Sequence, residues 1–225
     1  MSDTPGGSRL VVFTRYPTPG RTKTRLIPAL GAEGAAELQR RMTEHTLTRV
    51  GAHSLAPADG PTALEIELAF DGGSTESMER WVSEMRTAAR VSLVPQGEGD
   101  LGARMARAFE RGFDAGRTAV VIVGVDAPGI TADHVRVALE ALAKRDVVFG
   151  PAADGGYWLV GLARPAPSLF ADIDWGTDRV LAESLAIADR EGLSVERLPT
   201  LRDVDRPEDL EVWEAERREG GASDA

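Results

Sequence analysis

The sequence contains no cysteine, which excludes disulfide bonds and thiolate metal sites. It also lacks an apolar run long enough to span a bilayer, and residues 1–8 show no signal-peptide pattern, so we expect a soluble, cytoplasmic protein without a membrane partner. Neither the GxGxxG fingerprint of dinucleotide-binding folds nor the GxxxxGK[ST] phosphate loop follows the first apolar run. A bound phosphate group would therefore contact charged side chains on an irregular loop.

Positive charge is scarce and unevenly placed. The chain has 26 Lys and Arg against 36 Asp and Glu, a formal net charge of -10, which argues against nonspecific nucleic-acid binding. Yet no acid occurs between Thr4 and Ala32, while five bases do. Any anionic ligand must therefore bind through a local basic patch.

This basic segment directly follows an apolar run, Leu10–Phe13, which predicts a buried strand. Pro17, Pro19 and Gly20 indicate a tight turn, and Gly20 allows a ligand to approach the backbone. The loop carries Arg15, Arg21, Lys23 and Arg25. A cationic loop after the first strand of an α/β protein is typical of phosphate binding. The alternative is a solvated basic loop, and we favour phosphate binding because the sign opposes the charge of the whole protein.

Strand and helix patterns alternate along the chain and predict a single-domain, doubly wound α/β fold with a mostly parallel sheet and helices on both faces. We expect the domain to span residues 9–218 between flexible ends at 1–8 and 219–225. The close spacing of the last two apolar runs before residue 163 suggests an antiparallel insertion. Expected strands lie at 10–13, 65–71, 91–94, 119–125, 146–151, 157–162 and 194–198, and expected helices at 31–50, 74–85, from 101, after 131, 177–191 and up to 218.

Three aspartates are candidate ligands for a divalent cation. Asp126 ends the most apolar strand, where a carboxylate is costly unless solvated, hydrogen-bonded or metal-bound, and hard oxygen ligands beside a phosphate loop suit Mg²⁺ or Mn²⁺. Asp203 and Asp205, two residues apart, would point the same way in an extended segment. Helix capping is the competing interpretation: Asp126 could cap a turn, and Asp205, with Glu208 three residues on, resembles a capping box.

Glycine-rich segments mark further candidate binding loops. The first runs from Pro95 to Gly102, opens a helix, and is followed by Arg104, the one arginine of that helix placed to meet a ligand. In the second, Asp154, Gly155 and Gly156 precede Tyr157, which could be a ligand-binding turn or an ordinary hairpin turn. Trp175 could stack on an acceptor or cover the core edge, and Thr177 could cap the next helix.

Six segments, PTPGRTKTRL, QGEGDLGARM, GVDAP, DGGYWLVGL, WGTDRV and DVDRPEDL, together resemble a bacterial family of nucleotide-diphospho-sugar transferase-like proteins. The family is labelled as glycosyltransferases, including arsenosugar-biosynthesis-associated ones, and is similar in fold to 2-phospholactate guanylyltransferases and molybdopterin cytidylyltransferases. The resemblance covers residues 9 to 214. It implies a GT-A-type, Rossmann-like sheet that binds a nucleotide.

The resemblance also implies roles for particular residues. The phosphate loop would be Arg15, Lys23 and Arg25, beside Gly20 and Arg21, and the metal would be held by Asp126 and Asp205. Two departures stand out: GVDAP lacks the Asp-x-Asp pair of many GT-A glycosyltransferases, and Arg206 stands where relatives usually have Thr. The loop near the nucleobase would contain Gln96, Gly97 and Gly102, and the sugar or acceptor would be bordered by Asp154, Gly155, Gly156, Tyr157, Trp175 and Thr177.

Three functions remain open at this point. The first is a nucleotidyltransferase that joins a nucleoside triphosphate to a phosphorylated small molecule and releases pyrophosphate, with Lys23 and Arg25 neutralising the leaving group. The second is a glycosyltransferase that uses a nucleotide-sugar donor, with Asp154 as a base. The third is a nucleotide-binding module without catalysis. The density of the basic loop favours the first, because a triphosphate brings more negative charge than a sugar diphosphate.

Overall fold

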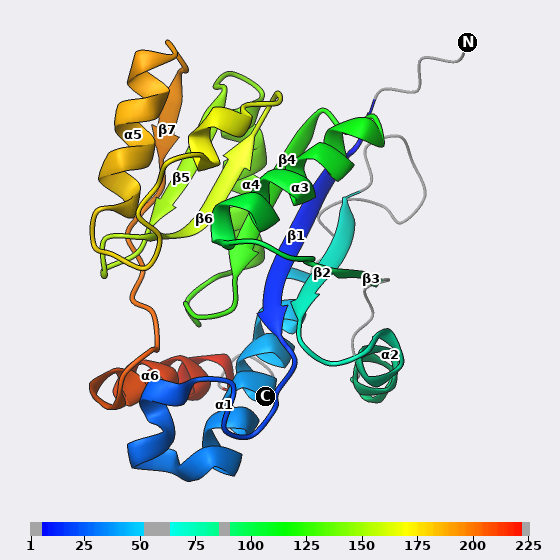
Figure 1. Ribbon diagram of the computed structural model, residues 1–225, viewed down its shortest axis with the longest axis vertical. Helices are drawn as coiled ribbons and strands as arrows, with labels where there is room; N and C mark the ends of the chain where they lie inside the picture. The colour runs from blue at the N-terminus through cyan, green and yellow to red at the C-terminus, as the bar shows by residue number, and fades with distance from the viewer. Residues whose placement is uncertain (1–5, 52–63, 86–90, 222–225) are drawn as a thin grey trace.

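The computed structural model describes residues 6–51, 64–85 and 91–221. Residues 1–5 and 222–225, which belong to the ends predicted to be flexible, lie outside the described residues. A seven-stranded sheet with strand order β3-β2-β1-β4-β6-β5-β7 forms its centre (Figure 1). The strands are β1 Ser8–Arg15, β2 Glu65–Asp71, β3 Val91–Pro95, β4 Ala119–Gly124, β5 Val147–Pro151, β6 Tyr157–Leu162 and β7 Val195–Arg197.

β6 is the one antiparallel strand in this sheet. It lies between β4 and β5 and runs opposite to both, while β1 pairs in parallel with β2 and β4. The expected antiparallel insertion and the mostly parallel α/β sheet are confirmed. Because the other strands share one direction, the loops that follow β1, β2, β3, β4, β5 and β7 emerge at the same edge of the sheet.

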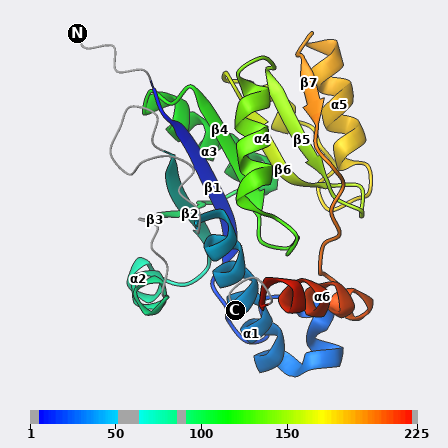
Figure 2. The ribbon, with the colours of Figure 1, turned by 180° about the vertical axis from the view of Figure 1, so that it is seen from behind.

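Helices cover both faces of the sheet (Figures 1 and 2). Side chains of α1, α2 and α4 pack with Leu10 and Val12 on one face, and those of α3 and α5 pack with Val11 and Phe13 on the other. The alternation along β1 explains why this strand is an uninterrupted apolar run: both of its faces are buried. The helices are α1 Ile27–Gly51, α2 Thr75–Glu84, α3 Leu101–Asp114, α4 Ala132–Leu142, α5 Val180–Arg190 and α6 Leu210–Gly221, with short 3-10 turns η1 Thr24–Leu26, η2 Pro167–Phe170 and η3 Pro207–Asp209.

A third, smaller core lies beyond the carboxyl edge of the sheet. There Leu26, Met42, Val204 and Trp213 pack together from η1, α1, the segment after β7, and α6. Figure 2 shows α6 lying across α1 at this end of the molecule. This core fixes both the end of the basic loop and the segment that carries Asp203 and Asp205.

The element boundaries differ from the expected ones in a few places. β1 begins at Ser8, and α6 continues to Gly221. α1 starts at Ile27, but Gly31 has a non-helical φ of 71° and kinks the helix. The expected start at residue 31 therefore corresponds to the regular part of α1 after the kink. None of the helices in the described ranges is both long and apolar enough to cross a membrane.

Candidate functional site at the carboxyl edge of the sheet

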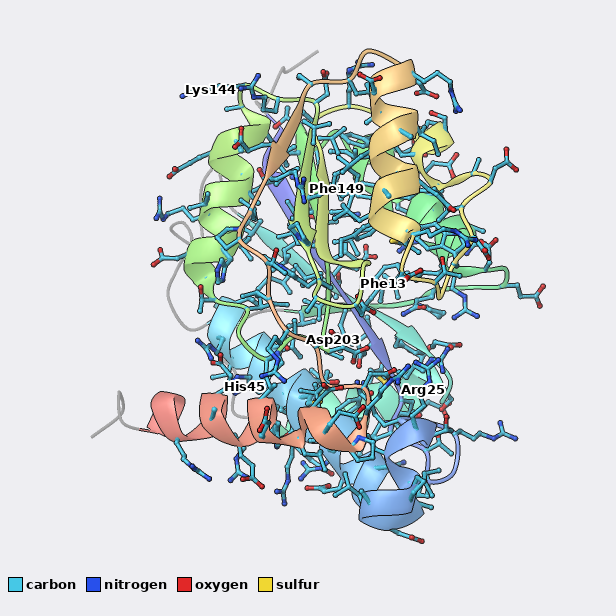
Figure 3. The ribbon with its side chains drawn as sticks, turned by 90° about the vertical axis from the view of Figure 1, so that its left-hand side faces the viewer. Phe13, Arg25, His45, Lys144, Phe149 and Asp203 are labelled. Atoms are coloured by element: carbon cyan, nitrogen blue, oxygen red, sulfur yellow. The ribbon has the colours of Figure 1, made fainter. Side chains whose placement is uncertain are left out.

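The carboxyl edge brings together charged residues from four separate loops, those after β1, β4, β5 and β7. Arg15 ends β1, Asp126 follows β4, and Asp154 follows β5. Arg25 and Asp203 lie near each other at this edge, while Lys144 lies at the opposite end of the sheet (Figure 3). The loops after β1 and β7 therefore place basic and acidic candidates side by side, as expected for parallel strands.

Lys23 is held at the centre of this edge. Its ammonium group lies 2.8 Å from Asp126 Oδ1 and donates a hydrogen bond of 2.5 Å to the carbonyl of Val204. Val204 in turn donates its backbone N–H to the Asp126 carbonyl at 2.8 Å. The Lys23 side chain is only 4% exposed, whereas that of Asp126 is 56% exposed. Lys23 thus links the loops after β1, β4 and β7, and Asp126 still faces solvent.

Arg25 forms a second pair of opposite charges with Asp205. Its side chain is 65% exposed, and the pKa of Arg25 is raised by its hydrogen bond and charge interaction with Asp205 and, further away, by Asp154. Arg15 contacts Asp71 at 3.3 Å, and Arg104 contacts the same carboxylate at 3.0 Å. Arg21 is exposed on the same loop.

The capping interpretation of Asp205 is wrong. In the structure Asp209, not Asp205 or Glu208, accepts the backbone N–H groups of Asp205 and Arg206, at 3.2 and 2.8 Å. Arg206 is the residue at the N-cap position of η3. The Asp205 side chain is turned instead toward Arg25, because the turn begins one residue later than the sequence pattern indicated.

Asp203 sits among other carboxylates. Burial raises its pKa, and the negative charges of Asp154, Asp126 and Asp209 raise it further. Asp154 is exposed, and its Oδ1 accepts the backbone N–H of Gly156 at 2.9 Å. Within the described part of the chain, however, no three Asp, Glu, His or Cys side chains are grouped closely enough to hold a metal ion by themselves.

The glycine-rich loop after β3 is tied to the strand ends. The Gln96 side-chain amide is buried and donates to the carbonyls of Thr14 and Ala69, at 3.1 and 3.0 Å. A Cβ on Gly97 would lie 2.9 Å from the Arg107 guanidinium, which donates to the Gln96 and Glu98 carbonyls. Arg107 therefore ties this loop to α3. The Gln96 amide is already engaged within the protein.

Gly102 has a packing reason to be glycine. A Cβ there would lie 2.4 Å from the Phe170 carbonyl and 2.7 Å from Trp175 Nε1. Trp175 thus packs against the start of α3, and its ring also contacts Tyr157 edge-on with centroids 6.4 Å apart. The Tyr157 hydroxyl is buried without a hydrogen-bond partner in the described ranges, and burial raises the pKa of Tyr157. Trp175 and Tyr157 both keep partial exposure, whereas Gly102 and Phe170 are buried.

Thr177 does not cap α5 as expected. The residue at the N-cap position is Arg179, with no side-chain capping bond. Thr177 instead donates its hydroxyl to the Asp174 carbonyl at 2.8 Å and accepts the N–H of Arg179 at 3.3 Å. Its role is to shape the turn before the helix, because the N-cap lies two residues later than predicted.

The turn at Gly155 is packed against this segment and provides a stability test. Gly155 has φ of 90°, and a Cβ on it would lie 2.1 Å from the Asp178 carbonyl oxygen. Gly176 has a similar φ of 84° but open space around it. We expect Gly155→Ala to lower the melting temperature clearly more than Gly176→Ala. In both variants an alanine at positive φ costs about 1 kcal/mol or more of stability. Only at Gly155 must the new Cβ also displace neighbouring backbone. Equal losses in thermal unfolding would contradict the close approach.

Sequence analysis gave no role to His45, but the structure does. His45 Nε2 lies 3.1 Å from the Pro128 carbonyl, in the loop that begins with Asp126. Arg49 donates to the same carbonyl at 3.3 Å and pairs with Glu216 of α6 at 2.7 Å. These residues brace the Asp126 loop from α1 and α6. In the sequence, His45 and Arg49 are four residues apart and so share one face of a helix. That pattern does not identify their partner Pro128, which is 79 or more residues away.

The partly buried His45 also predicts a pH dependence. Burial lowers its pKa from the ordinary value of 6.5 and outweighs the opposing hydrogen bond to the Pro128 carbonyl, and the positive charge of Arg49 lowers the pKa further. The unfolded chain then binds more protons than the folded one as the pH falls through 6.5, so stability is lost on the acid side. We expect His45→Gln to reduce the fall in melting temperature between pH 7 and pH 5. An unchanged pH profile would contradict a His45 imidazole that stays neutral in the folded protein.

The chain matches one family model and is similar to known structures. A family model described as "Uncharacterized protein conserved in bacteria (DUF2064)" matches residues 55–177. A crystal structure from Desulfovibrio desulfuricans G20, provisionally named a nucleotide-diphospho-sugar transferase, is 30% identical, with a TM-score of 0.78, and the match covers 89% of this chain and 83% of that one. The search of curated proteins gave no match.

Two further solved structures are similar in fold. One is the 4-diphosphocytidyl-2C-methyl-D-erythritol synthase of Anaerococcus prevotii DSM 20548, with a TM-score of 0.62, 10% identity, and 97% of this chain and 100% of that one covered. The other is a CMP:2-keto-3-deoxy-manno-octonic acid synthetase in complex with CTP, with a TM-score of 0.59, 12% identity, and 96% and 100% covered. At these identities the likeness shows the shared Rossmann-like α/β fold.

Proposed function

The chain belongs to the bacterial family DUF2064, and from the geometry of the site we propose that it is a metal-dependent nucleotidyltransferase. It transfers a nucleotidyl group from a nucleoside triphosphate to a phosphorylated small molecule and releases pyrophosphate. The observation that carries the proposal is the pair of opposite-charge contacts, Lys23 with Asp126 and Arg25 with Asp205. A complex of a cation with a polyphosphate matches both signs, the cation facing the acids and the phosphates facing the bases.

The acidic side of the site fits a hard cation, Mg²⁺ or Mn²⁺. Asp126 and Asp205 would hold it, with a weaker contribution from Asp203. Magnesium sites at nucleotides commonly use one or two carboxylates and take their other ligands from substrate phosphates and water. A site with too few grouped carboxylates to hold a metal alone, as found in the described residues, agrees with that pattern. When bound, the cation would neutralise charge on the phosphate oxygens.

In the proposed reaction an oxygen of the acceptor phosphate attacks the α-phosphorus of the nucleotide. The bond from that phosphorus to the oxygen bridging to the β-phosphate breaks, and pyrophosphate leaves with the electron pair. Lys23 and Arg25 would neutralise the charge on the leaving group. Arg15, Gly20 and Arg21 would complete the phosphate loop, and the segment from Gln96 to Gly102 would border the nucleoside.

Charge matching favours a triphosphate over a nucleotide sugar. The loop carries Arg15, Arg21, Lys23 and Arg25 within eleven residues. A sugar diphosphate brings about two negative charges, whereas a metal-free triphosphate brings nearly four and needs more neutralisation. The absence of an Asp-x-Asp pair around Asp126 supports the same choice.

Glycosyl transfer from a nucleotide sugar is the second candidate. It is favoured by the exposed Asp154 carboxylate, which would face an acceptor and serve as a base, and by the provisional name of the 30% identical structure. In that reaction the turn from Asp154 to Tyr157, with Trp175 and Thr177 nearby, would border the acceptor sugar.

A thermal-shift panel tests the ligand class. We expect nucleoside triphosphates to raise the melting temperature in the presence of Mg²⁺ or Mn²⁺ more than nucleotide sugars do, because a ligand that binds only the folded state stabilises it. Stabilisation by nucleotide sugars alone would favour glycosyl transfer. No shift with any nucleotide would contradict both candidates, and nucleotide binding without turnover for any acceptor would indicate a binding module.

Asp205 and Asp209 form a matched pair of variants. Asp205→Asn should leave the melting temperature nearly unchanged, since a largely exposed ion pair contributes about 0–1 kcal/mol, but should lower metal-dependent turnover. Asp209→Ala should do the reverse, because the loss of a side chain that caps a turn costs about 0.5–2 kcal/mol. Thermal unfolding and turnover are measured for both. A strongly destabilised Asp205→Asn with normal turnover would return Asp205 to a structural role.

A further inference from the structure

Lys23 is the least exposed of the basic residues in the phosphate loop, and its charge is already paired with groups of the protein. Its ammonium group contacts both Asp126 and the Val204 carbonyl, and the side chain is almost fully buried. Arg15, Arg21 and Arg25 are exposed on the same loop. A polyphosphate that approaches the protein in this state meets the arginines but not the lysine.

We propose that Lys23 is a metal-gated phosphate ligand: a cation that binds Asp126 releases the Lys23 ammonium group, which then binds the polyphosphate. This inference rests on the proposed function and adds to it a coupling between cation and polyphosphate binding. The cation and the polyphosphate bind cooperatively because each takes one partner of the same ion pair.

The charges of Lys23 and Asp126 favour binding of the cation and the polyphosphate together over binding of either one alone. A cation at Asp126 alone would lie beside the Lys23 ammonium group, and like charges at this separation repel strongly when one of them is buried. A polyphosphate alone would approach Asp126, whose carboxylate still faces solvent, and would be repelled by it. When both bind, Asp126 faces the cation and Lys23 faces the anion. The polyphosphate then offsets the repulsion between the cation and Lys23, and the cation offsets the repulsion between the polyphosphate and Asp126.

The backbone around Lys23 confines the change to its side chain. Lys23 has a φ of 48°, an unusual left-handed conformation for a lysine, and precedes η1. Thr22 and Leu26 on either side are buried, and Leu26 lies in the core that also contains Val204 and Trp213. The loop is therefore anchored at both flanks, and the ammonium group can change partners by rotation of the long, flexible lysine side chain.

The test measures the affinity of inorganic tripolyphosphate, a probe without a base or sugar, by calorimetry with and without excess Mg²⁺. For the wild type we expect Mg²⁺ to tighten binding by roughly 10- to 100-fold, the size of one charge-assisted contact. Lys23→Met should lose most of this gain while its metal-free affinity stays close to the wild-type value. Lys23→Gln keeps a hydrogen-bond donor without the charge, and it carries the same expectation if the Met variant folds poorly.

Asp126→Ala should change the metal-free affinity for tripolyphosphate, which Lys23→Met leaves nearly constant. Without metal it should bind tripolyphosphate more tightly than the wild type, because Lys23 is released. Adding Lys23→Met to this variant should abolish the part of the gain that passes through Lys23, and the double-mutant cycle measures that part. Asp178→Asn, which removes an exposed carboxylate beside the Gly155 turn, controls for net charge and should change the affinity little.

The outcomes separate this inference from the proposed function. A metal-induced gain that survives intact in Lys23→Met or Lys23→Gln, or additive effects of Asp126→Ala and Lys23→Met, would overturn the gating role and leave nucleotidyl transfer standing. Absence of tripolyphosphate binding to the wild type in Mg²⁺ would overturn the gating role as well. If nucleoside triphosphates also gave no thermal shift, the proposed function would fall with it.

Discussion

Asp126→Asn should lower metal-dependent turnover by at least about 100-fold and leave the fold intact. Asn removes the charge of a carboxylate that faces solvent at the carboxyl edge, and even residues that only orient metal ligands commonly contribute 10–100-fold. The side chain is more than half exposed, and its backbone remains fixed through Val204. Turnover at saturating Mg²⁺ or Mn²⁺ and thermal unfolding are measured together, with Asp178→Asn as the charge control.

A wild-type rate for Asp126→Asn at saturating metal would contradict the metal role of this residue. Loss of activity accompanied by a large drop in melting temperature would instead assign Asp126 to the Lys23–Val204 link as a structural part. The two results are distinguishable because rate and stability are measured on the same preparation.

Arg25→Ala should weaken triphosphate binding by roughly 10- to 100-fold, since the loss of a charge-assisted phosphate contact costs on the order of 1.5–3 kcal/mol. The fold should be unaffected, because the contact of Arg25 with Asp205 is solvent-exposed and contributes little. Calorimetric titration with a nucleoside triphosphate in Mg²⁺ measures the change. Arg179 is a matched control, being an exposed arginine paired with Asp174 and Glu183 but outside the basic loop.

If Arg25→Ala bound nucleotide as tightly as the wild type while Arg179→Ala bound it less tightly, the ligand would lie nearer α5 than the phosphate loop. Equal affinity for both variants and the wild type would mean that the basic loop is a solvated charge run, which was the competing interpretation of the sequence.

The sheet was predictable because its strands carry strong one-dimensional signals. The apolar run of β1 and that of β4 have both faces buried, and such runs identify central strands without any knowledge of their partners. The common edge of the candidate loops then follows from parallel pairing alone. The sequence could therefore place Arg15, Asp126 and Asp154 at one end of the molecule.

The pairing of individual side chains was not predictable. Lys23 and Val204 are 181 residues apart, and no local pattern indicates that the loop lysine is buried against the segment after β7. The capping error at Asp205 has a similar origin: Asp205 with Glu208 matched a capping box, but the turn starts at Pro207 and Asp209 accepts the N–H bonds. Local patterns define which residues can cap, and tertiary packing of Val204 selects which one does.

Release of pyrophosphate tests the central claim most directly. The protein is incubated with each nucleoside triphosphate, Mg²⁺ or Mn²⁺, and a pool of sugar phosphates and small phosphorylated acids, and pyrophosphate is assayed against Asp126→Asn as the control. Nucleotidyl transfer predicts pyrophosphate that depends on the metal, on an acceptor and on Asp126. No pyrophosphate with any acceptor, together with metal-dependent release of a nucleoside diphosphate from a nucleotide sugar, would contradict nucleotidyl transfer and establish glycosyl transfer in its place.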